Sequence, residues 1–314
     1  MSALICGSMA FDTIMVFPDR FKNHLLPEQL HILNVSFLVP EMRRNFGGCA
    51  GNIAYNLKLL GDEPLIMATV GTDFAPYRHH LTQLGLRTDY LREIADSYTA
   101  QAFITTDLDD NQITAFHPGA MMFSHQNQVG QAHEARLVIV SPDGREGMLQ
   151  HARETVAAGL PLVFDPGQGM PLFNGDDLNE FIQLASYITL NDYEAQLLQE
   201  RTQRSLEEIA GEVKALVVTL GGSGSIIYAD GQKHTIACAP VNAVVDPTGC
   251  GDAYRAGLLY GIARQWDWQT TGQLAALLGA IKIEHRGGQN HHFTPDSLAS
   301  RYQAAFGQAL PNLE

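Results

Sequence analysis

The chain has 314 residues, of which 45% are hydrophobic and 17% are charged, and its formal net charge at pH 7 is −14. This composition is ordinary for a globular protein and excludes an intrinsically disordered one. The acidic balance excludes broad nucleic-acid binding, which requires a basic surface to displace counterions. An anionic ligand would therefore have to be held by helix N-termini, backbone amides and a metal ion.

We expect a cytoplasmic protein that does not enter a membrane. The longest apolar runs, such as residues 215–220, are far shorter than the roughly 20 residues that a spanning helix needs. The N-terminal residues lack a basic region and read as a first strand, not as a signal peptide. The four cysteines lack the spacing of a zinc site, so we expect reduced thiols.

Short apolar runs, rich in β-branched residues and without alternation, predict parallel strands that are buried on both faces. In chain order they cover residues 4–7, 65–70, 137–140, 160–164, 187–190 and 216–219. Helical patterns lie between them, at residues 53–60, 144–158, 192–201 and 250–264. This alternation predicts an α/β fold with a doubly wound, mostly parallel sheet.

Two insertions interrupt this alternation and predict a small antiparallel β sheet. The predicted strand pairs are residues 14–17 with 31–39, and residues 99–106 with 112–116. We interpret this sheet as a lid over the active site, and a passive surface decoration is the alternative. The predicted division is a core of residues 1–12, 46–97 and 120–314 and a lid of residues 13–45 and 98–119.

The stretch Asp246-Pro-Thr-Gly-Cys-Gly-Asp252 stands at the start of the last long helical pattern. Gly249 and Gly251 let the backbone approach a ligand and leave amide N–H groups pointing outward. Together with the positive end of the helix dipole, they predict an anion site without a basic side chain. A carboxylate beside such a site, here Asp252, can accept the proton of an attacking hydroxyl. The alternative is a plain helix start.

Two further segments follow predicted strands. Leu220-Gly-Gly-Ser-Gly-Ser225 is a tight turn that could lie along a nucleotide, although alone it is more often a hairpin turn. Asn191-Asp-Tyr-Glu194 stands at a strand-to-helix junction, on the edge where α/β sheets bind ligands. Glu194 could order water around Mg²⁺, or Asn191 could only cap the helix.

The N-terminal third supplies the other half of a site. Ser8 and Asp12 follow the first strand, and Phe46-Gly-Gly-Cys-Ala-Gly-Asn52 opens the next helix. Asp12 and Asn52 could hold neighbouring sugar hydroxyls while the glycines admit the ring. Either residue could instead be a structural cap.

The two glycine signatures, about 200 residues apart, resemble those of the ribokinase-like sugar kinases, the PfkB family, over nearly the full chain. Within that family four stretches resemble bacterial adenosine kinases and related nucleoside kinases. They are residues 7–12, 25–28, 35–39 and 114–121.

The resemblance implies phosphoryl transfer from ATP, with Mg²⁺, to the ribose 5′-hydroxyl of a nucleoside. It implies that Asp252 is the base and that the amides of Gly249, Cys250 and Gly251 form the anion hole. The implied substrate contacts are Ser8, Asp12, Ser36, Gly48, Asn52, Phe103, Phe116 and Gln168. The implied nucleotide contacts are Asn191, Thr219, Gly221 and Gly224. Glu194 is then assigned to Mg²⁺, and Asp246 and Thr248 to a possible K⁺.

Two assignments keep alternatives open. Phe103 and Phe116 could stack on the base, or form the core of the lid. The segment Asp165-Pro-Gly-Gln168-Gly-Met170 has one glutamine where related adenosine kinases often have two, and it lacks their following arginine. Fewer polar groups would then read the purine edge. We therefore expect an enzyme that accepts several nucleosides, inosine and guanosine among them.

Competing functions are a kinase of free sugars with the same fold and a catalytically silent nucleoside-binding protein. The intact Asp252 disfavours the silent protein, because binding alone needs no base. A sugar-phosphate acceptor would need basic residues, and Arg43 and Arg44 read as solvated surface residues. The edges and the apolar face of the small sheet favour a homodimer.

Overall fold

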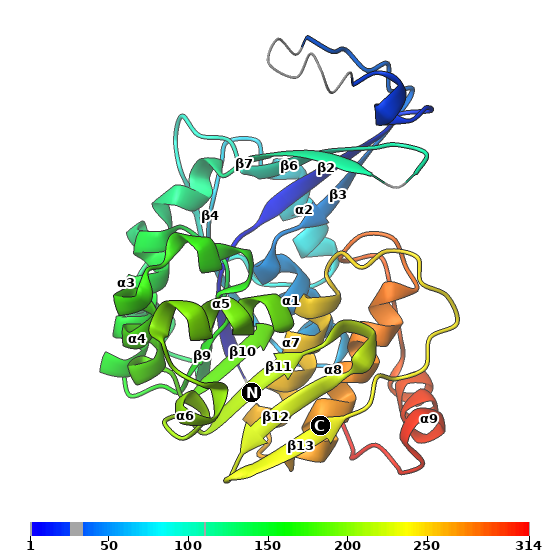
Figure 1. Cartoon of the computed structure of the whole chain (residues 1–314). Coiled ribbons are helices and arrows are strands. Elements are labelled where there is room, and N and C mark those ends of the chain that lie inside the picture. Colours follow the sequence, from blue (N-terminus) through cyan, green and yellow to red (C-terminus); the bar gives the residue numbers. More distant parts are fainter. Residues whose placement is uncertain (1, 26–33, 110, 314) are drawn as a thin grey trace.

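The computed structural model describes residues 2–25, 34–109 and 111–313. Within this part of the chain, the larger sheet has nine strands in the order β13-β12-β11-β10-β9-β8-β1-β4-β5 (Figure 1). Their bounds are β1 Ala3–Cys6, β4 Leu65–Val70, β5 Tyr90–Glu93, β8 Leu137–Val140, β9 Leu162–Phe164, β10 Tyr187–Asn191, β11 Ala215–Thr219, β12 Ser225–Ala229 and β13 Gln232–Ile236.

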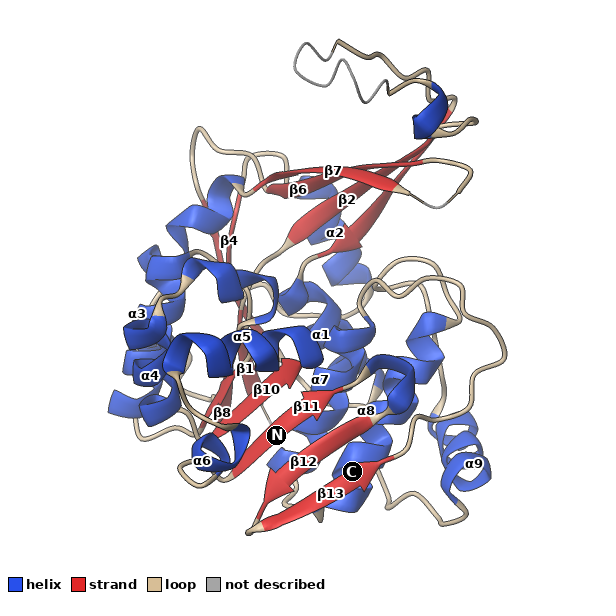
Figure 2. Ribbon diagram, in the orientation of Figure 1, coloured by secondary structure: helices blue, strands red, loops and turns tan. Residues whose placement is uncertain are grey.

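The strands from β11 to β5 pair in parallel, whereas β12 and β13 continue the sheet as antiparallel hairpin strands. The central strands are buried on both faces because helices cover both sides (Figure 2). The helices are α1 Cys49–Leu59, α2 Ala75–Gln83, α3 Arg145–Ala157, α4 Gly175–Leu184, α5 Asp192–Thr202, α6 Leu206–Ala210, α7 Cys250–Ala263, α8 Trp268–Ile283 and α9 Pro295–Phe306.

Two large apolar clusters occupy the two sides of the sheet. Ile5 of β1 packs with residues of α1, α2, α7, α8 and α9. The residues before and after it in the chain, Leu4 and Cys6, pack on the other side of the sheet with residues of α3, α4 and α5. Burial of both faces explains why the strand sequences lack alternation, and the predicted doubly wound α/β fold is confirmed.

The chain reverses its direction of travel across the sheet next to β1. It passes from β1 to β4 and β5 on one side, and then returns to β8 on the other side and continues to β11. Ligands of open α/β sheets bind outside the carboxyl ends of the strands at such a reversal. The fold therefore directs attention to the loops that follow β1, β9, β10 and β11.

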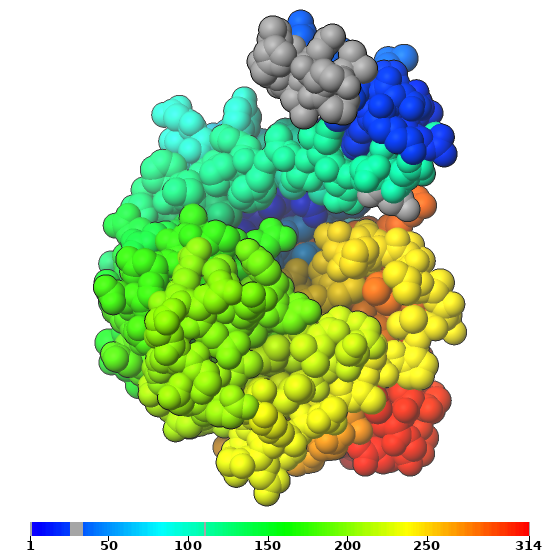
Figure 3. Space-filling model, viewed as in Figure 1, coloured from blue at the N-terminus to red at the C-terminus, as the bar shows by residue number. Residues whose placement is uncertain are grey.

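The smaller sheet has the order β3-β2-β6-β7 and stands above this edge, and we call it the lid sheet. Its strands are β2 Ala10–Val16, β3 Glu41–Gly47, β6 Ala100–Thr106 and β7 Gln112–His117. The two outer pairs are antiparallel, and β2 pairs with β6 in parallel between them. Figure 3 shows a hollow between the lid sheet and the body of the molecule.

The partner of β2 differs from the predicted one. Residues 34–40 form no strand, and β2 pairs instead with β3, which begins directly after Pro40. The alternating Val35, Phe37 and Val39 suggested a strand, but the Phe37 ring packs on the rings of Phe17 and Phe21. This aromatic contact holds the segment outside the ladder. Residues 31–33 of the predicted strand and residues 26–28 of one resembling stretch lie outside the described residues.

The helices begin and end close to their predicted bounds, and α1 begins four residues before the predicted start at residue 53. Gly48 caps α1 with φ +85°, a conformation that glycine adopts easily. A side chain at Gly48 would also approach Ser8 O to 2.5 Å and Ala10 N to 2.6 Å. None of the helices in the described ranges has both the length and the apolar character that a membrane crossing requires.

Candidate active site

The turn before α7 has the geometry of an anion site. Gly249 is the N-cap residue of α7 and has φ +78°, and a Cβ atom there would lie 3.1 Å from the Cα atom of Gly288. The amides of the first turn have no carbonyl partner within the helix and point toward its N-terminus. One predicted donor is engaged elsewhere, because Cys250 N donates to Pro247 O at 3.1 Å. The main-chain amides of Gly251 and its neighbours therefore remain as the chief donors to an anion at the N-terminus of α7.

Asp252 lies in the first turn of α7, and its carboxylate contacts the N-terminal signature. Asn52 Nδ2 donates to Asp252 Oδ2 at 2.8 Å, which joins residues 200 positions apart. Asn52 is buried in the first turn of α1. The two helix N-termini therefore converge on one carboxylate.

Burial raises the pKa of Asp252 to about 6 from its ordinary value of 3.8. The hydrogen bond from Asn52 and the positive charge of Arg255 oppose this rise, and the negative charge of Asp165 adds to it. A carboxylate with a pKa near 6 is ionised at neutral pH and is a stronger base than an exposed aspartate. It is suited to accept a proton from a hydroxyl.

A segment that was not predicted completes the surroundings of Asn52. Gln289 Nε2 donates to Asn52 Oδ1 at 3.1 Å and to the Tyr77 hydroxyl at 2.5 Å. A side chain at Gly288 would overlap with the Asn52 amide. The glycine pair before Gln289 is a sequence signal of close backbone approach, but it does not identify the contacted residue. Both ends of the Asn52 amide are thus engaged, and this residue orients Asp252.

Asp12 lies on β2 at the base of the lid sheet, close to Gly47. A side chain at Gly47 would overlap with the Asp12 carboxylate and would displace it. Burial raises the pKa of Asp12 to about 6, and the negative charges of Asp252 and Asp246 contribute to the rise. The negative charge of Asp252 therefore acts on the Asp12 carboxyl group.

Ser8 is buried at the end of β1, and its hydroxyl accepts from Cys49 N at 3.2 Å. This contact caps α1, and it leaves Ser8 close to Gly48, which is one of the predicted substrate contacts.

The lid sheet separates the two predicted stacking residues. Asp12 is in register with Ala102, which is in register with Phe116, so Asp12 and Phe116 share one face. Phe103 is in register with Thr13 and lies on the opposite face. Phe116 is 52% exposed and Phe103 is 40% exposed. The structure therefore brings Phe116, and not Phe103, to the face that carries Asp12.

The two arginines of the lid sheet also lie on opposite faces. Arg43 is in register with Ile14, on the face of Asp12, whereas Arg44 is in register with Thr13. The Arg44 guanidinium lies 3.6 Å from the centre of the Phe11 ring, and it pairs with Asp73 at 3.5 Å. Only Arg43 is on the side of the hollow.

The carboxyl ends of β10 and β11 lie side by side. Asn191 is in register with Thr219, and Thr219 is in register with Ser225 across the hairpin of β11 and β12. Gly221 and Gly224 form the turn of this hairpin, with φ values of +55° and +90°. A side chain at Gly224 would overlap with Ile236 O, so the turn requires glycine there. The predicted nucleotide contacts thus occupy one continuous edge.

Asn191 and Glu194 form a reciprocal capping box at the start of α5. Asn191 Oδ1 accepts from Glu194 N at 2.7 Å, and Glu194 accepts from Asn191 N and Nδ2, both at 2.8 Å. The helix-cap alternative is therefore realised. Glu194 is nevertheless buried, and burial raises the pKa of its carboxyl group.

A buried ion pair, unrecognised in the sequence, joins α7 to the ends of β9 and β10. Arg255 donates to both oxygens of Asp165, from Nη2 at 2.8 Å and from Nε at 3.0 Å. Its Nη2 atom also lies 3.9 Å from Glu194 Oε2. Arg255 stands three residues after Asp252 and therefore on the same part of α7. No local sequence pattern predicts its partners, because Asp165 follows β9 and Glu194 lies in the first turn of α5.

Mg²⁺ favours oxygen ligands, retains water, and is commonly held by one or two carboxylates together with substrate phosphates. Glu194 fits such an outer-sphere role, since its carboxylate stands at the edge that carries Thr219 and Asn191. When bound there, Mg²⁺ would neutralise phosphate charge during transfer.

Three predicted residues lie apart from the central group. Gln168 is exposed on the short 3₁₀ helix Gly167–Leu172 after β9. Ser36 is exposed in the segment that packs on Phe17, which directly follows the end of β2 farther from Asp12. Thr248 is exposed, and its amide donates to Asp246 Oδ1 at 2.9 Å.

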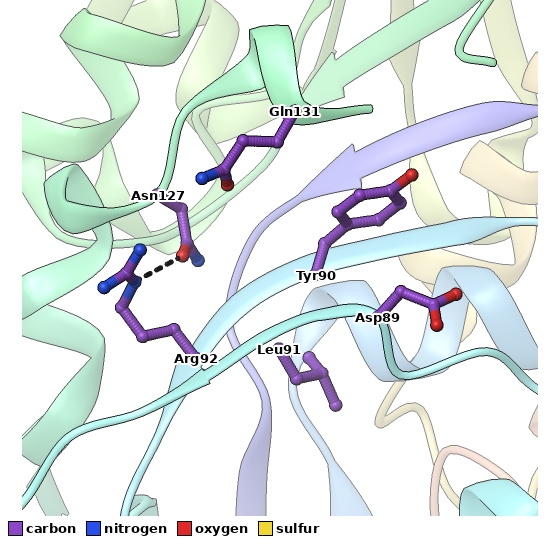
Figure 4. A pocket seen from close by; sticks show the side chains of 6 residues that line it. All are labelled: Asp89, Tyr90, Leu91, Arg92, Asn127 and Gln131. Carbon is purple, nitrogen blue, oxygen red and sulfur yellow. Dashed lines mark hydrogen bonds between the residues drawn. The ribbon is translucent and has the colours of Figure 1, made fainter. Parts of the chain in front are cut away.

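A separate cavity of about 470 Å³ lies at the edge of the large sheet that β5 forms (Figure 4). Residues of β5 line it together with Asn127 and Gln131, and Arg92 Nε donates to Asn127 Oδ1 at 3.1 Å. None of the predicted site residues is among those that line it. This cavity is distinct from the group around Asp252.

The chain is similar to known proteins. Residues 9–295 match the model of the pfkB family carbohydrate kinases. A nucleoside kinase of Methanocaldococcus jannaschii is 31% identical over 273 residues, which cover 86% of this chain and 89% of that protein.

Two solved structures of a Burkholderia thailandensis nucleoside kinase are also similar. The complex with inosine has a TM-score of 0.90 and 51% identity, and the match covers 99% of this chain and all of that one. The complex with ADP-inosine has a TM-score of 0.88 and 52% identity, covering 99% of this chain and 98% of that one. The chain therefore belongs to the pfkB family of carbohydrate kinases, and it is a phosphotransferase that acts on a hydroxyl group.

Proposed function

We propose that this enzyme is a nucleoside kinase that transfers the γ-phosphate of ATP to the ribose 5′-hydroxyl of adenosine, inosine and other nucleosides. The observation that carries the proposal is the contact of Asn52 with Asp252 at the N-terminus of α7. It joins a predicted acceptor site to a predicted phosphate site on a single buried carboxylate. The likeness to the Burkholderia structures with inosine and ADP-inosine supports a nucleoside as the acceptor.

In the proposed reaction, the ionised Asp252 accepts the proton of the 5′-hydroxyl. The hydroxyl oxygen forms a bond to the γ-phosphorus, the bond from that phosphorus to the β–γ bridging oxygen breaks, and ADP leaves. The amides of Gly249 and Gly251 and the dipole of α7 stabilise the negative charge on the transferred group. Asn52 keeps the carboxylate aimed at the hydroxyl.

The donor side is proposed to lie along the ends of β10 and β11. Thr219, Gly221 and Gly224 would line ATP, and Glu194 would hold Mg²⁺ through water. Arg255 supports this role because it pairs with Asp165 and lies near Glu194, so it holds two carboxylates in fixed positions between the donor site and Asp252.

The acceptor side is proposed to lie under the lid sheet. Asp12, Gly48 and Ser8 would contact the ribose, and Phe116 would cover the base. Phe116 lies on the face of Asp12 and is exposed, so it can gain a stacking partner when a base binds. We expect Phe116→Ala to raise KM for nucleosides by roughly 5- to 150-fold, because stacking on a base contributes roughly 1–3 kcal/mol. Phe103→Ala, on the opposite face, is the matched control.

An ADP-release assay across adenosine, inosine, guanosine, cytidine, ribose and fructose tests the acceptor. We expect kcat/KM values for adenosine, inosine and guanosine that lie within about two orders of magnitude of one another, because a loosely read base changes binding by only a few kcal/mol. A preference of a thousandfold or more for adenosine would contradict the broad specificity. Turnover confined to ribose or fructose would overturn the nucleoside assignment and favour a sugar kinase.

We also propose a homodimer that forms through the lid sheet. Met42, Phe103 and Ile113 are exposed on the face opposite to Asp12, and β3 and β7 are free edge strands within the described residues. Light scattering on the purified protein tests this, and replacement of Ile113 by Lys should shift a dimer toward the monomer.

A further inference from the structure

Lys282 is a lysine with no exposed surface, in the last turn of α8. Its Nζ atom donates to Asp246 O at 2.7 Å and to His285 O at 2.9 Å. Among the residues that the structure describes, no carboxylate oxygen forms an ion pair with it within 4.0 Å. Lysine is almost never fully buried without a partner. Here the partners are main-chain carbonyl oxygens, the ligands that also suit a potassium ion.

The two carbonyl groups belong to the loops on either side of the phosphate-binding turn. Asp246 stands just before Gly249, and His285 follows α8. The amides of Val245 and Asp246 donate to Ile283 O at 2.9 and 3.1 Å, and Gly287 N donates to Asp246 Oδ2 at 2.8 Å. The ammonium group therefore sits where the two loops are joined.

We propose that the Lys282 ammonium takes the place of a monovalent cation behind the phosphate-binding turn, so that the enzyme needs no potassium ion. Asp246 and Thr248 were the residues assigned to a possible K⁺, and Asp246 O is occupied by the ammonium instead. The residues present therefore do not fit an added monovalent cation. The inference rests on the phosphoryl-transfer chemistry of the family and not on the identity of the acceptor.

The charge of Lys282 reaches the turn through a single carbonyl group. Asp246 O accepts from the ammonium, and the Cys250 thiol, on the first residue of α7, lies 3.8 Å from the same oxygen. A positive charge at this point adds to the field of the α7 N-terminus, where phosphate charge would be stabilised. The C-terminal end of α8 favours a cation at Lys282.

The Asp246 carboxylate accepts hydrogen bonds from Gly287 N at 2.8 Å and from Thr248 N at 2.9 Å, while the main-chain oxygen of the same residue accepts from the Lys282 ammonium. Asp246 therefore ties the phosphate-binding turn both to Lys282 and to the loop that follows α8. Lys282 is a positioning residue in this scheme, since it acts on phosphate through the turn.

Kinetics of the wild type in KCl and in tetramethylammonium chloride, at equal ionic strength, provide the first test. Tetramethylammonium is too large and too weak a hydrogen-bond partner to replace K⁺ at carbonyl oxygens. We expect wild-type kcat and the Kd for ADP, measured by calorimetry without an acceptor, to agree between the two salts within about twofold. The ADP measurement holds whether or not the nucleoside assignment is correct.

Lys282→Ala provides the second test, because it leaves space for an added cation. We expect its kcat in tetramethylammonium chloride to fall by about tenfold or more, its acceptor KM to change little, and part of the lost rate to return in KCl or methylammonium chloride. Its Tm should also rise in KCl relative to tetramethylammonium chloride. Lys282→Met, which fills the space without a charge, should show neither rescue.

Lys58→Met is the matched control, since Lys58 also lies in the last turn of a helix but pairs with Glu63 on the surface. It should behave as the wild type in every salt. The proposal is overturned if K⁺ raises the wild-type kcat or ADP affinity several-fold. It is also overturned if Lys282→Met folds and retains both the wild-type kcat and the wild-type affinity for ADP. If neither Lys282 variant folds, the wild-type comparison decides alone.

Discussion

Asp252→Asn separates the proposed chemical role of this carboxylate from its cost to the fold. The substitution keeps the shape of the side chain, and its amide oxygen can still accept from Asn52 Nδ2, but it removes the base. Positioned acid–base groups contribute roughly 10²- to 10⁴-fold to rate. We therefore expect kcat to fall by that factor, while the Kd values for ADP and inosine change by less than about threefold.

The same substitution should stabilise the protein at neutral pH. The pKa of Asp252 is raised from 3.8 to about 6, which costs the ionised carboxylate at most about 3 kcal/mol at 1.36 kcal/mol per pH unit. Below pH 3.8 the carboxyl is protonated in both the folded and the unfolded chain, so the penalty is absent. It grows as pH rises through the interval up to about 6 and is complete at pH 7.

Melting curves between pH 4 and pH 8 measure this difference. We expect the Tm of Asp252→Asn to exceed that of the wild type by a few °C at pH 7.5, with the gap closing toward pH 4. Asp176→Asn is the control, because Asp176 is an exposed aspartate in the first turn of α4. A kcat near the wild-type value would refute Asp252 as the base, and an equal Tm at both pH values would refute the argument from burial.

Further predictions concern the supports of the site. Asn52→Ala removes a hydrogen bond that lowers the pKa of Asp252. The acid limb of the pH profile of kcat/KM, expected near pH 6 in the wild type, should therefore move to higher pH. An unchanged limb would contradict this. Gly224→Ala should destabilise the fold by more than 2 kcal/mol because its Cβ would overlap with a carbonyl oxygen, whereas Gly221→Ala has open space and should lose only about 1 kcal/mol in denaturant titrations. Arg255→Met should lower the free energy of unfolding by about 3–5 kcal/mol, since it leaves the Asp165 carboxylate buried and unpaired. Adding Asp165→Asn to Arg255→Met should restore part of that loss, and a purely additive double variant would show that the pair is not coupled.

The sequence alone predicted those features of the fold that depend on neighbouring residues. Continuous apolar runs predicted parallel strands, and the glycines before Asp252 predicted the start of α7, whereas α1 begins four residues before its predicted start. These signals are local because capping, backbone freedom and burial on both faces act within a few residues. The doubly wound fold followed from their order.

Local patterns failed where a long-range contact competed with them. Val35, Phe37 and Val39 have the alternation of a strand, yet the Phe37 ring packs on Phe17 and the ladder begins only after Pro40. Phe103 and Phe116 also looked equivalent along the chain. The register of the lid sheet placed only Phe116 on the face of Asp12, since one residue of offset reverses the face of a side chain.

The contacts that give the site its electrostatics were decided only by the tertiary structure. Gln289 on Asn52, Arg255 on Asp165, and Lys282 on Asp246 O each join segments separated by more than 30 residues. No spacing rule predicts such pairs, because the partners meet only after the helices have packed on the sheet. The sequence therefore determined which residue could act as a base, and the packing determined the charges and hydrogen bonds that surround it.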